Sequence, residues 1–269
     1  YEITTRLVGS EMCIRDRLAK AEKIENYYGF AEPISGKELL TRGIDGAERL
    51  GVKFTNKQAV SIDYEDGGFS VVTSDDKKHM CKAVLLATGS RRLAPNIEGL
   101  TEFEGKGVSY CAVCDAFFYR NKNVGVLGSG EYALHEAKIL AKTSKSVTVF
   151  TNGEEPTAVF PSEFTIVKEP LSSLTGEAKI EKAVLRDGTE VKIDGLFVAY
   201  GVASSAALAQ KAGAVTIGGK IRVNDSMMTN VNGLFAAGDC TGGLLQVSKA
   251  VGDGAAAGMA IIKYIKRDK

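Results

Sequence analysis

The chain has 269 residues, of which 44% are hydrophobic and 25% charged, a balance typical of a globular protein with room for one large or two ordinary domains. The formal net charge is +1, so the composition shows no electrostatic footprint for nucleic acid or an anionic membrane surface. No apolar run approaches the ~18 residues that a membrane span needs.

The first 17 residues are excluded from the predicted fold. Residues 7–17 resemble translated sequencing-adapter read-through and show no sustained strand or helix period. We interpret residues 1–17 as an artefact and assign Cys13 no role. The first 30 residues also lack the charged head and apolar core of a secretory signal, which indicates a cytoplasmic protein.

A helix and a group of strands are predicted next. Ser35 with Glu38 three residues later forms a capping box, the start signal of a helix that runs to about Leu50. Short β-branched runs between Asp-Gly-Gly and Asp-Asp turns then predict a small meander or hairpin over residues 52–81. A buried strand is predicted over residues 83–87, ending at a glycine turn.

The middle of the chain predicts a parallel sheet. A linker rich in Arg, Pro and Gly over residues 91–107 marks a domain boundary. Residues 123–150 then follow the order strand, glycine turn, helix, strand, which is a βαβ unit. Another buried strand is predicted over residues 195–201. The similar strand ends at 87–89 and 199–201 are interpreted as the points where the chain leaves one domain and returns to it.

The last part of the chain predicts a mixture of elements. A helix is expected over residues 205–212, a hairpin around Gly218 and a strand that ends at Gly238. A long terminal helix follows, in which a stripe of apolar residues that includes Met259 is expected to pack in the core. The predicted fold class is therefore α/β.

The sharpest chemical feature is the pair Cys111 and Cys114. Two cysteines at this spacing can close a disulfide at a helix start, where the helix dipole favours a thiolate. The alternative is half of a zinc site, which needs a second pair. Neither Cys81 nor Cys240 has a neighbouring Cys or His to supply one. We favour a redox dithiol in a cytoplasmic protein and expect no metal.

A glycine turn follows the predicted strand that begins at residue 124. Gly128 would allow the tight turn, Gly130 the close approach of a pyrophosphate, and Ala133 the close packing of helix on strand. The acidic or basic residue that selects the ribose should end the next strand, but Thr151 and Asn152 stand there. Two hypotheses remain open: the turn binds a pyridine nucleotide, or it is architectural and binds none.

Gly238 and Asp239 close an apolar strand near the end of the chain. Open α/β sheets bind ligands at the carboxyl ends of their strands, and a carboxylate there can accept hydrogen bonds from a ribityl chain. The alternative is a plain turn at the end of the strand.

Taken together, these residues resemble the thioredoxin reductase family of flavin-dependent disulfide reductases, from about Leu18 to the C-terminus. The matching segments occur in the order IENYYGF, ISGKELL, LLATGS, FEGKGVSYCAVCDAFF, the glycine turn and GLFAAGD. The resemblance implies two Rossmann-like, nucleotide-binding domains with parallel sheets, the second inserted in the first. We expect residues 18–92 to be an incomplete first part of the FAD-binding domain, 93–200 the inserted dithiol domain and 201–269 the second part of the FAD-binding domain.

The resemblance also implies a role for each matching residue. Cys114 would take electrons from the flavin, Cys111 would attack the disulfide of thioredoxin, and Asp115 would protonate the departing thiolate. Asp239 would hold the ribityl chain of the FAD. The other residues expected along the flavin are Asn26, Gly238, Gln246 and Val247.

The chain departs from the family pattern in three places. First, the chain lacks the family's opening strand, G-x-G-x-x-G turn and helix. Second, Phe150-Thr151-Asn152 replaces the basic His-Arg-Arg motif that follows the second strand. Third, the segment 151–193 is short for a nucleotide-binding domain. The last two departures are similar to the ferredoxin-dependent flavin thioredoxin reductases of anaerobic bacteria. Because the first glycine turn is missing, the 269 residues are expected to bind FAD poorly and to be inactive as they stand.

The favoured hypothesis is an enzyme that passes electrons from ferredoxin through FAD and the dithiol to thioredoxin, with NAD(P)H doubtful as a donor. We expect a homodimer without nucleic-acid or membrane partners. The alternatives are an NADPH-dependent thioredoxin reductase, a flavoprotein reductase of a peroxiredoxin-type partner and, in a different class, a non-enzymatic redox-sensing module that binds nucleotide.

Overall fold

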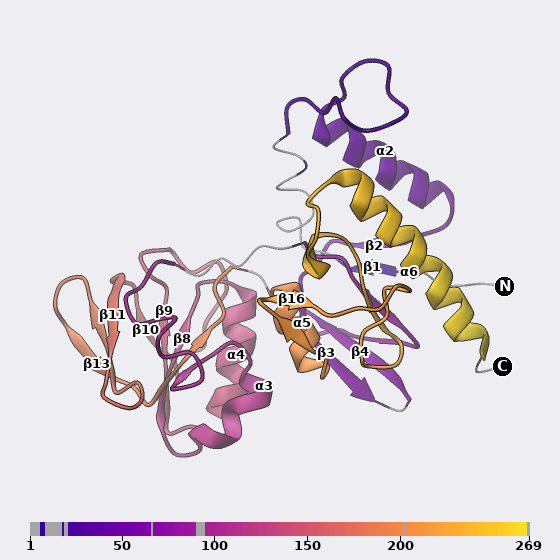
Figure 1. Ribbon diagram of the computed structural model, residues 1–269. Helices are drawn as coiled ribbons and strands as arrows, with labels where there is room; N and C mark the ends of the chain where they lie inside the picture. Colours follow the sequence, from indigo (N-terminus) through magenta and orange to yellow (C-terminus); the bar gives the residue numbers. More distant parts are fainter. Residues whose placement is uncertain are drawn as a thin grey trace. The chain divides into compact units, whose positions relative to one another are not determined.

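The computed structural model describes residues 6–8, 18, 21–65, 67–89, 95–201 and 203–267. The chain divides into two compact units, each described by itself below (Figure 1). Unit 1 combines residues 1–91 with residues 204–269, and unit 2 comprises residues 92–203.

Unit 2 is built around a parallel sheet. In its described residues the sheet has five strands in the order β10-β9-β8-β14-β7, and every neighbouring pair runs parallel. These strands are β7 (Val108–Ser109), β8 (Asn123–Leu127), β9 (Ser146–Phe150), β10 (Thr165–Val167) and β14 (Gly195–Val198). Helix α4 (Glu131–Ala141) connects β8 to β9, so the predicted βαβ unit and the α/β fold class are confirmed.

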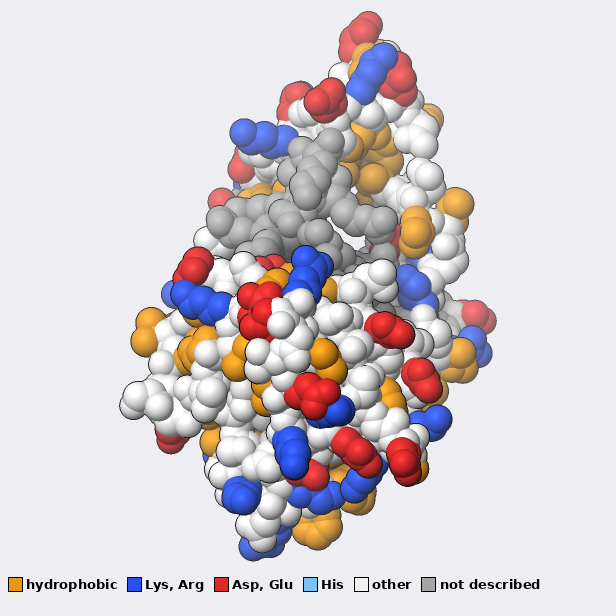
Figure 2. Space-filling model, turned by 90° about the vertical axis from the view of Figure 1, so that its left-hand side faces the viewer, with side chains coloured by type: hydrophobic (Ala, Val, Ile, Leu, Met, Phe, Trp, Pro, Cys, Tyr) orange, Lys and Arg blue, Asp and Glu red, His pale blue; other side chains and the backbone are white. Residues whose placement is uncertain are grey.

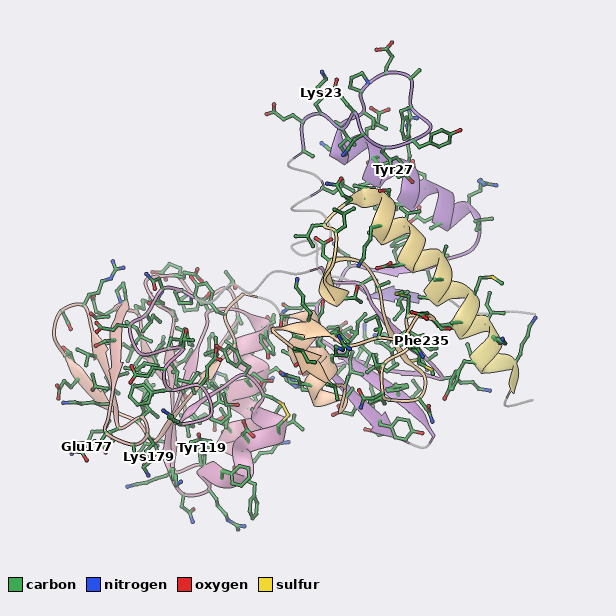
Figure 3. All side chains as sticks on the ribbon, viewed as in Figure 1. Lys23, Tyr27, Tyr119, Glu177, Lys179 and Phe235 are labelled. Atoms are coloured by element: carbon green, nitrogen blue, oxygen red, sulfur yellow. A yellow bond between two sulfur atoms is a disulfide. The ribbon has the colours of Figure 1, made fainter. Side chains whose placement is uncertain are left out.

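The core of unit 2 explains why its parallel strands are apolar and why position 195 is a glycine. Leu127, Phe150 and Leu196 come from three neighbouring strands and are completely buried, as expected where helices and further strands cover a parallel sheet. At Gly195 any side chain would collide with the ring of Tyr119, which is labelled in Figure 3. Tyr119 packs edge-on against Phe197 with ring centroids 5.1 Å apart.

A second, antiparallel sheet fills the short segment before β14. It consists of β11 (Leu171–Thr175), β12 (Lys182–Leu185) and β13 (Glu190–Lys192). Its apolar side chains join the core of the parallel sheet through Leu171, Leu174 and Ala183.

Unit 1 begins with the predicted helix. Helix α2 (Gly36–Arg49) has Ser35 as its N-cap, and the Ser35 hydroxyl accepts the backbone N–H of Glu38 at 3.1 Å, as the capping box predicts. The predicted meander is the antiparallel sheet β3 (Ala59–Glu65), β4 (Gly68–Thr73) and β5 (Lys78–Cys81).

One further strand pair of unit 1 was not expected from the sequence. Strand β1 (Arg6–Val8) pairs in parallel with β2 (Lys53–Thr55). The chain therefore has an element inside residues 1–17, where the sequence predicts none. Cys13 and most of that segment lie outside the described residues.

Unit 1 also contains a pair of parallel strands, β6 (Val84–Leu86) and β17 (Leu234–Ala236). Phe235 of β17 packs edge-on against Tyr264 of the terminal helix (Figure 3). The remaining elements are α5 (Ser205–Lys211), the hairpin β15 (Thr216–Ile217) with β16 (Lys220–Ile221), the 3-10 turn η2 (Gly238–Thr241) and α6 (Val247–Arg267).

Two burial predictions for unit 1 are wrong. The strand predicted as buried over residues 83–87 buries Leu86 but leaves Leu85 37% exposed. Met259 on α6 was expected in the core and is 70% exposed. A helical period shows that apolar residues share one face, but it does not show what covers that face.

The described surface carries both signs of charge. On the face shown in Figure 2, basic and acidic side chains are interspersed, in agreement with the net charge of +1. None of the helices in the described residues is long and apolar enough to cross a membrane.

Candidate functional site

The residues of unit 2 that the sequence analysis predicts to be functional follow the C-terminal ends of its parallel strands. The dithiol follows β7, the glycine turn follows β8, and Thr151 follows β9. Because the strands are parallel, these segments meet at one edge of the sheet, which is where open α/β sheets bind ligands.

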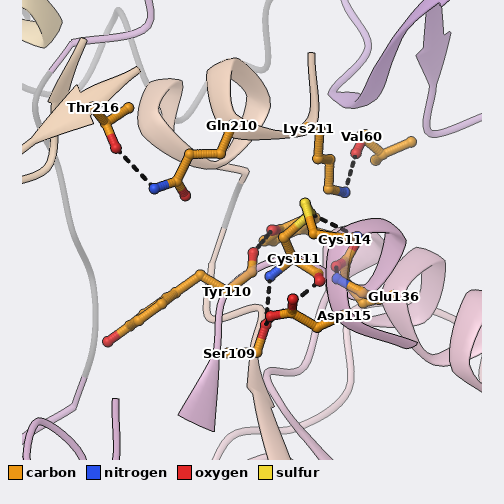
Figure 4. Close-up of a disulfide and its surroundings, with 12 residues drawn as sticks. Val60, Ser109, Tyr110, Cys111, Cys114, Asp115, Glu136, Gln210, Lys211 and Thr216 are labelled. Atoms are coloured by element: carbon orange, nitrogen blue, oxygen red, sulfur yellow. Dashed lines mark hydrogen bonds between the residues drawn. A yellow bond between two sulfur atoms is a disulfide. The ribbon is translucent and has the colours of Figure 1, made fainter. Parts of the chain in front are cut away.

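Cys111 and Cys114 form a disulfide, with their Cα atoms 5.4 Å apart (Figure 4). Cys111 is the N-cap of the one-turn helix α3 (Ala112–Asp115), and its sulfur accepts the backbone N–H of Cys114 at 3.2 Å. In the structure Cys111 is buried and Cys114 is exposed. The spacing of two residues between the cysteines is thus the spacing of one helical turn.

Ser109 holds the dithiol loop from its N-terminal side. Its hydroxyl accepts the backbone N–H of Cys111 at 3.1 Å and lies 2.7 Å from a carboxylate oxygen of Asp115, to which it donates (Figure 4). The structure therefore brings Asp115 to the dithiol through Ser109. The sequence analysis did not identify Ser109. Its position two residues before the first cysteine could have indicated a hydroxyl that hydrogen-bonds to the dithiol loop.

Two side chains of helix α4 also hydrogen-bond to the dithiol loop. The Tyr132 hydroxyl donates to the carbonyl of Tyr110 at 3.2 Å, and a carboxylate oxygen of Glu136 accepts the N–H of Ala112 at 2.8 Å. Both side chains are buried. Burial, with a smaller effect of the charge on Glu136, holds the pKa of Tyr132 well above its usual range. The two peptide groups that flank Cys111 are thereby fixed.

Apolar side chains are exposed in the segment that carries the dithiol. Val113 is 47% exposed, and Phe117 and Phe118 in the 3-10 turn η1 (Ala116–Tyr119) are 76% and 67% exposed. Side chains of this size are normally buried. Three of them lie within six residues, which makes this segment a candidate surface for contact with another protein.

The glycine turn has the backbone that its motif predicts. Gly128 has a φ of +151°, and a Cβ there would lie 2.2 Å from the carbonyl oxygen of Ala199 and 2.9 Å from the Cβ of Ala133. Only glycine at 128 and a small residue at 133 allow this packing of helix on strand. Gly130 is the N-cap of α4.

A carboxylate lies on the glycine turn, which sequence reasoning missed. Glu154 accepts the Ser129 hydroxyl at 2.5 Å, and its other oxygen accepts the hydroxyl of Tyr200. Burial, with the hydrogen bond and charge of Glu154, raises the pKa of Tyr200 to about 12. The side chain of Asn152, where a ribose-selecting residue would stand, accepts the backbone N–H of Leu171 at 2.9 Å.

The residues expected along a flavin lie in unit 1, and some of them meet. The Asn26 amide donates to the Gln246 amide oxygen at 3.0 Å, although the two are 220 residues apart. Helix α6 begins at Val247, directly after Gln246. Gly238 has a φ of +79° and carries the chain from β17 into η2, where Asp239 lies.

This donor set fits the ribityl and ring portion of a flavin. A carboxylate accepts hydrogen bonds from hydroxyls, side-chain amides both donate and accept, and a helix start offers backbone N–H groups. Asp239, Asn26, Gln246 and Val247 are the residues that would hold it.

Lys249 and Asp253 fix the turn that carries Asp239. The Lys249 ammonium donates to the carbonyls of Gly238 and Gly242, both at 2.9 Å, and to the Thr241 hydroxyl at 2.8 Å. It also pairs with Asp253 at 2.7 Å, and Asp253 accepts the N–H of Gly238 at 3.0 Å. A lysine in the first turn of a helix opposes the helix dipole, so these contacts must offset that cost.

We expect Lys249→Met to lower the free energy of unfolding by about 1–3 kcal/mol, because it leaves carbonyls and a largely buried carboxylate without their charged donor. Urea unfolding followed by circular dichroism measures this. Lys266→Met on the exposed side of the same helix is the matched control and should change stability by less than about 0.5 kcal/mol. Equal effects of the two variants would contradict a specific role for Lys249.

The other described cysteines are separate from the dithiol. Cys240 is buried in η2 and Cys81 half-buried in β5, and burial raises the pKa of both thiols. In the part of the chain that the structure describes, no three His, Cys, Asp or Glu side chains are placed to hold a metal ion.

Comparison with known proteins agrees with this geometry. The model of the pyridine nucleotide-disulphide oxidoreductase family matches residues 1–254. The thioredoxin reductase of Treponema pallidum (strain Nichols) is 32% identical over 259 residues, which cover 91% of this chain and 84% of that protein.

Two solved structures have a similar fold. An atypical thioredoxin reductase from Desulfovibrio vulgaris Hildenborough is 37% identical, with a TM-score of 0.91 and coverage of 98% of this chain and 90% of that one. A ferredoxin-flavin thioredoxin reductase from Clostridium acetobutylicum is 32% identical, with a TM-score of 0.70 and coverage of 97% and 88%.

Proposed function

Because the chain belongs to the thioredoxin reductase family of the pyridine nucleotide-disulphide oxidoreductases, we propose that it passes electrons from FAD through Cys111–Cys114 to thioredoxin, and that a ferredoxin rather than a pyridine nucleotide supplies them. The observation that carries this proposal is the disulfide on α3 with the Asp115 carboxylate held beside it by Ser109.

The dithiol chemistry follows from these contacts. Bound FAD supplies two electrons when reduced, and the Cys111–Cys114 disulfide takes them up together with two protons to give two thiols. Cys111 as a thiolate attacks the disulfide of thioredoxin, which forms a mixed disulfide and releases a thiolate of the partner. Asp115 takes up the proton that the Cys111 thiol loses and passes it to that departing sulfur. Cys114 then attacks Cys111 and its proton passes to the second sulfur of thioredoxin, which regenerates the disulfide and releases reduced thioredoxin.

The exposed apolar side chains support a protein substrate. Val113 lies inside the dithiol loop and Phe117 and Phe118 follow it directly. Exposed aromatic residues are enriched where proteins bind one another.

The glycine turn supports a donor other than a pyridine nucleotide. A pyrophosphate bound there would approach Ser129, whose hydroxyl is already bonded to the Glu154 carboxylate. Two negative groups at one helix start repel each other, so the carboxylate opposes binding of the nucleotide. The solved relative from Clostridium acetobutylicum, named as a ferredoxin-flavin enzyme, agrees with this choice of donor.

The flavin part of the proposal is tested by Asp239→Ala in a protein extended by the family's opening strand and G-x-G-x-x-G turn, because the 269 residues alone are expected to bind FAD poorly. We expect FAD to bind about ten- to a hundredfold more weakly, since a hydrogen bond to a charged group contributes about 1.5–3 kcal/mol. Fluorescence titration of the apoprotein with FAD measures this, and saturating FAD should restore thioredoxin reduction. Asp225→Ala on an exposed turn of the same unit is the control. Unchanged FAD affinity in Asp239→Ala would exclude this role.

A further inference from the structure

Glu136 is a buried carboxylate in contact with the dithiol helix, and none of the steps above uses it. It is 1% exposed. Its oxygen accepts the N–H of Ala112, the first residue of α3, at 2.8 Å (Figure 4). A glutamate is almost never this deeply buried unless it is paired or hydrogen-bonded, so its position next to a redox pair calls for an explanation.

The N–H of Ala112 is one of the free donors at the start of α3. At the start of a helix the free N–H groups favour negative charge, which lowers the pKa of a cysteine there. In this chain the carboxylate of Glu136 accepts that N–H, and the Cys111 sulfur accepts the N–H of Cys114. Glu136 therefore places a carboxylate at the same helix start that would stabilise a thiolate of Cys111.

The charge of Glu136 disfavours a thiolate in the dithiol. The ionisable groups on the elements of unit 2 around the dithiol are Asp115 on α3, Tyr119 on η1, and Glu131, Tyr132, His135, Glu136 and Lys138 on α4. Burial and nearby carboxylate charges raise the pKa values of both tyrosines, so both are neutral near pH 7. A carboxylate near a thiol disfavours the charged form of that thiol.

We propose that Glu136 is a positioning residue that keeps the dithiol strongly reducing, by binding the first N–H of its helix and placing a negative charge beside it. The step concerned is the two-electron, two-proton conversion of the Cys111–Cys114 disulfide into two thiols. Where a protein stabilises the thiolate, it stabilises the reduced form and its disulfide becomes a good oxidant. Glu136 has the opposite effect and favours delivery of electrons to a partner. This deepens the proposed function at the same dithiol.

The test measures the thiols of the full chain without flavin, ferredoxin or thioredoxin. Reduced protein is alkylated with iodoacetamide from pH 5 to 10, and peptide mass spectrometry follows Cys111 and Cys114 separately. We expect Glu136→Gln, which keeps a hydrogen-bond acceptor but removes the charge, to raise the alkylation rate at pH 7 about three- to tenfold. Glu131→Gln on the same helix is the control and should match the wild type.

A second measurement records the equilibrium of the dithiol with glutathione. Glu136→Gln should shift this equilibrium toward the reduced pair by a similar factor, because the thiolate is then less disfavoured. A merely structural glutamate would leave both readouts at their wild-type values in Glu136→Gln, and that result would overturn the proposal. If the variant does not fold, the wild type alone tests the proposal. The alkylation rate of its faster dithiol cysteine would then be plotted against pH. A midpoint below about pH 7.5, within the depressed pKa range of such motifs, would also overturn the proposal.

These outcomes are independent of the proposed function. A protein that fails to reduce thioredoxin can still show the expected shift in Glu136→Gln, and a protein that reduces thioredoxin can fail to show it.

Discussion

Cys111→Ser and Cys114→Ser are each expected to abolish thioredoxin reduction, for different reasons. Without Cys114 the dithiol cannot take up electrons from the flavin as a disulfide. Without Cys111 no thiol attacks the partner. In the protein extended by the family's opening strand and glycine turn, a steady-state assay with reduced ferredoxin and oxidised thioredoxin should show activity at the level of the protein-free blank for both variants. This is a loss of at least about a thousandfold, as when one member of a catalytic unit is removed.

The two variants are distinguished by the adduct that they form. Only Cys114→Ser keeps the attacking thiol of Cys111, and it lacks the second thiol that would resolve a mixed disulfide. We therefore expect a covalent complex with thioredoxin in Cys114→Ser, visible on non-reducing gels, and none in Cys111→Ser. Cys81→Ser should behave like the wild type. Equal trapping through Cys114 in Cys111→Ser would contradict this assignment of roles.

Local patterns predicted much of the fold. The Ser35 cap, the glycine turn at Gly128 and the parallel strands around it depend on residues close together in sequence, so their signals are complete within a short window. Recognition of the family added the arrangement of the two Rossmann-like domains, which periodicity alone does not determine.

Contacts between distant residues could not be predicted in the same way. Glu136 reaches Ala112 over 24 residues, Glu154 reaches Ser129 over 25, and Asn26 meets Gln246 over 220. Each pair depends on which strand ends or helices become neighbours in the folded unit. A charged residue in a sequence gives no sign of such a partner and is most often on the surface.

The burial of single residues was the other source of error. The apolar character of Met259 and Leu85 predicted a core position, yet both are exposed. Apolar atoms contribute more than half of the accessible surface of folded proteins, so hydrophobicity without knowledge of the neighbouring element is a weak predictor of burial.

The electron donor can be decided by kinetics. An arginine normally binds the 2′-phosphate of NADPH through bidentate, charge-assisted hydrogen bonds. After β9 this chain offers Thr151, Asn152 and Gly153, and the Asn152 side chain is bonded to Leu171. Losing one charged hydrogen bond costs about 1.5–3 kcal/mol, so losing two weakens binding about a hundredfold or more.

Binding of NADH is also expected to be weak. A carboxylate at the end of β9 would hold its ribose, but the nearest one, Glu154, is bonded to Ser129 and Tyr200 on the glycine turn. There it opposes the pyrophosphate that both nucleotides share. Glu154→Gln removes this charge without supplying the missing arginines, so we expect the variant to remain slow with NADPH.

Reduction of the bound flavin by each donor should therefore differ strongly. In anaerobic stopped-flow experiments at equal donor concentrations, we expect bleaching of the flavin by reduced ferredoxin to be at least about a hundredfold faster than by NADPH or NADH. Dithionite should bleach all samples and shows that the flavin is reducible. Thioredoxin has a potential of about −270 mV, so a low-potential ferredoxin has enough driving force for the whole transfer. Fast, saturable bleaching by micromolar NADPH would instead show that the glycine turn binds a nucleotide despite Glu154, and the donor would then be NADPH.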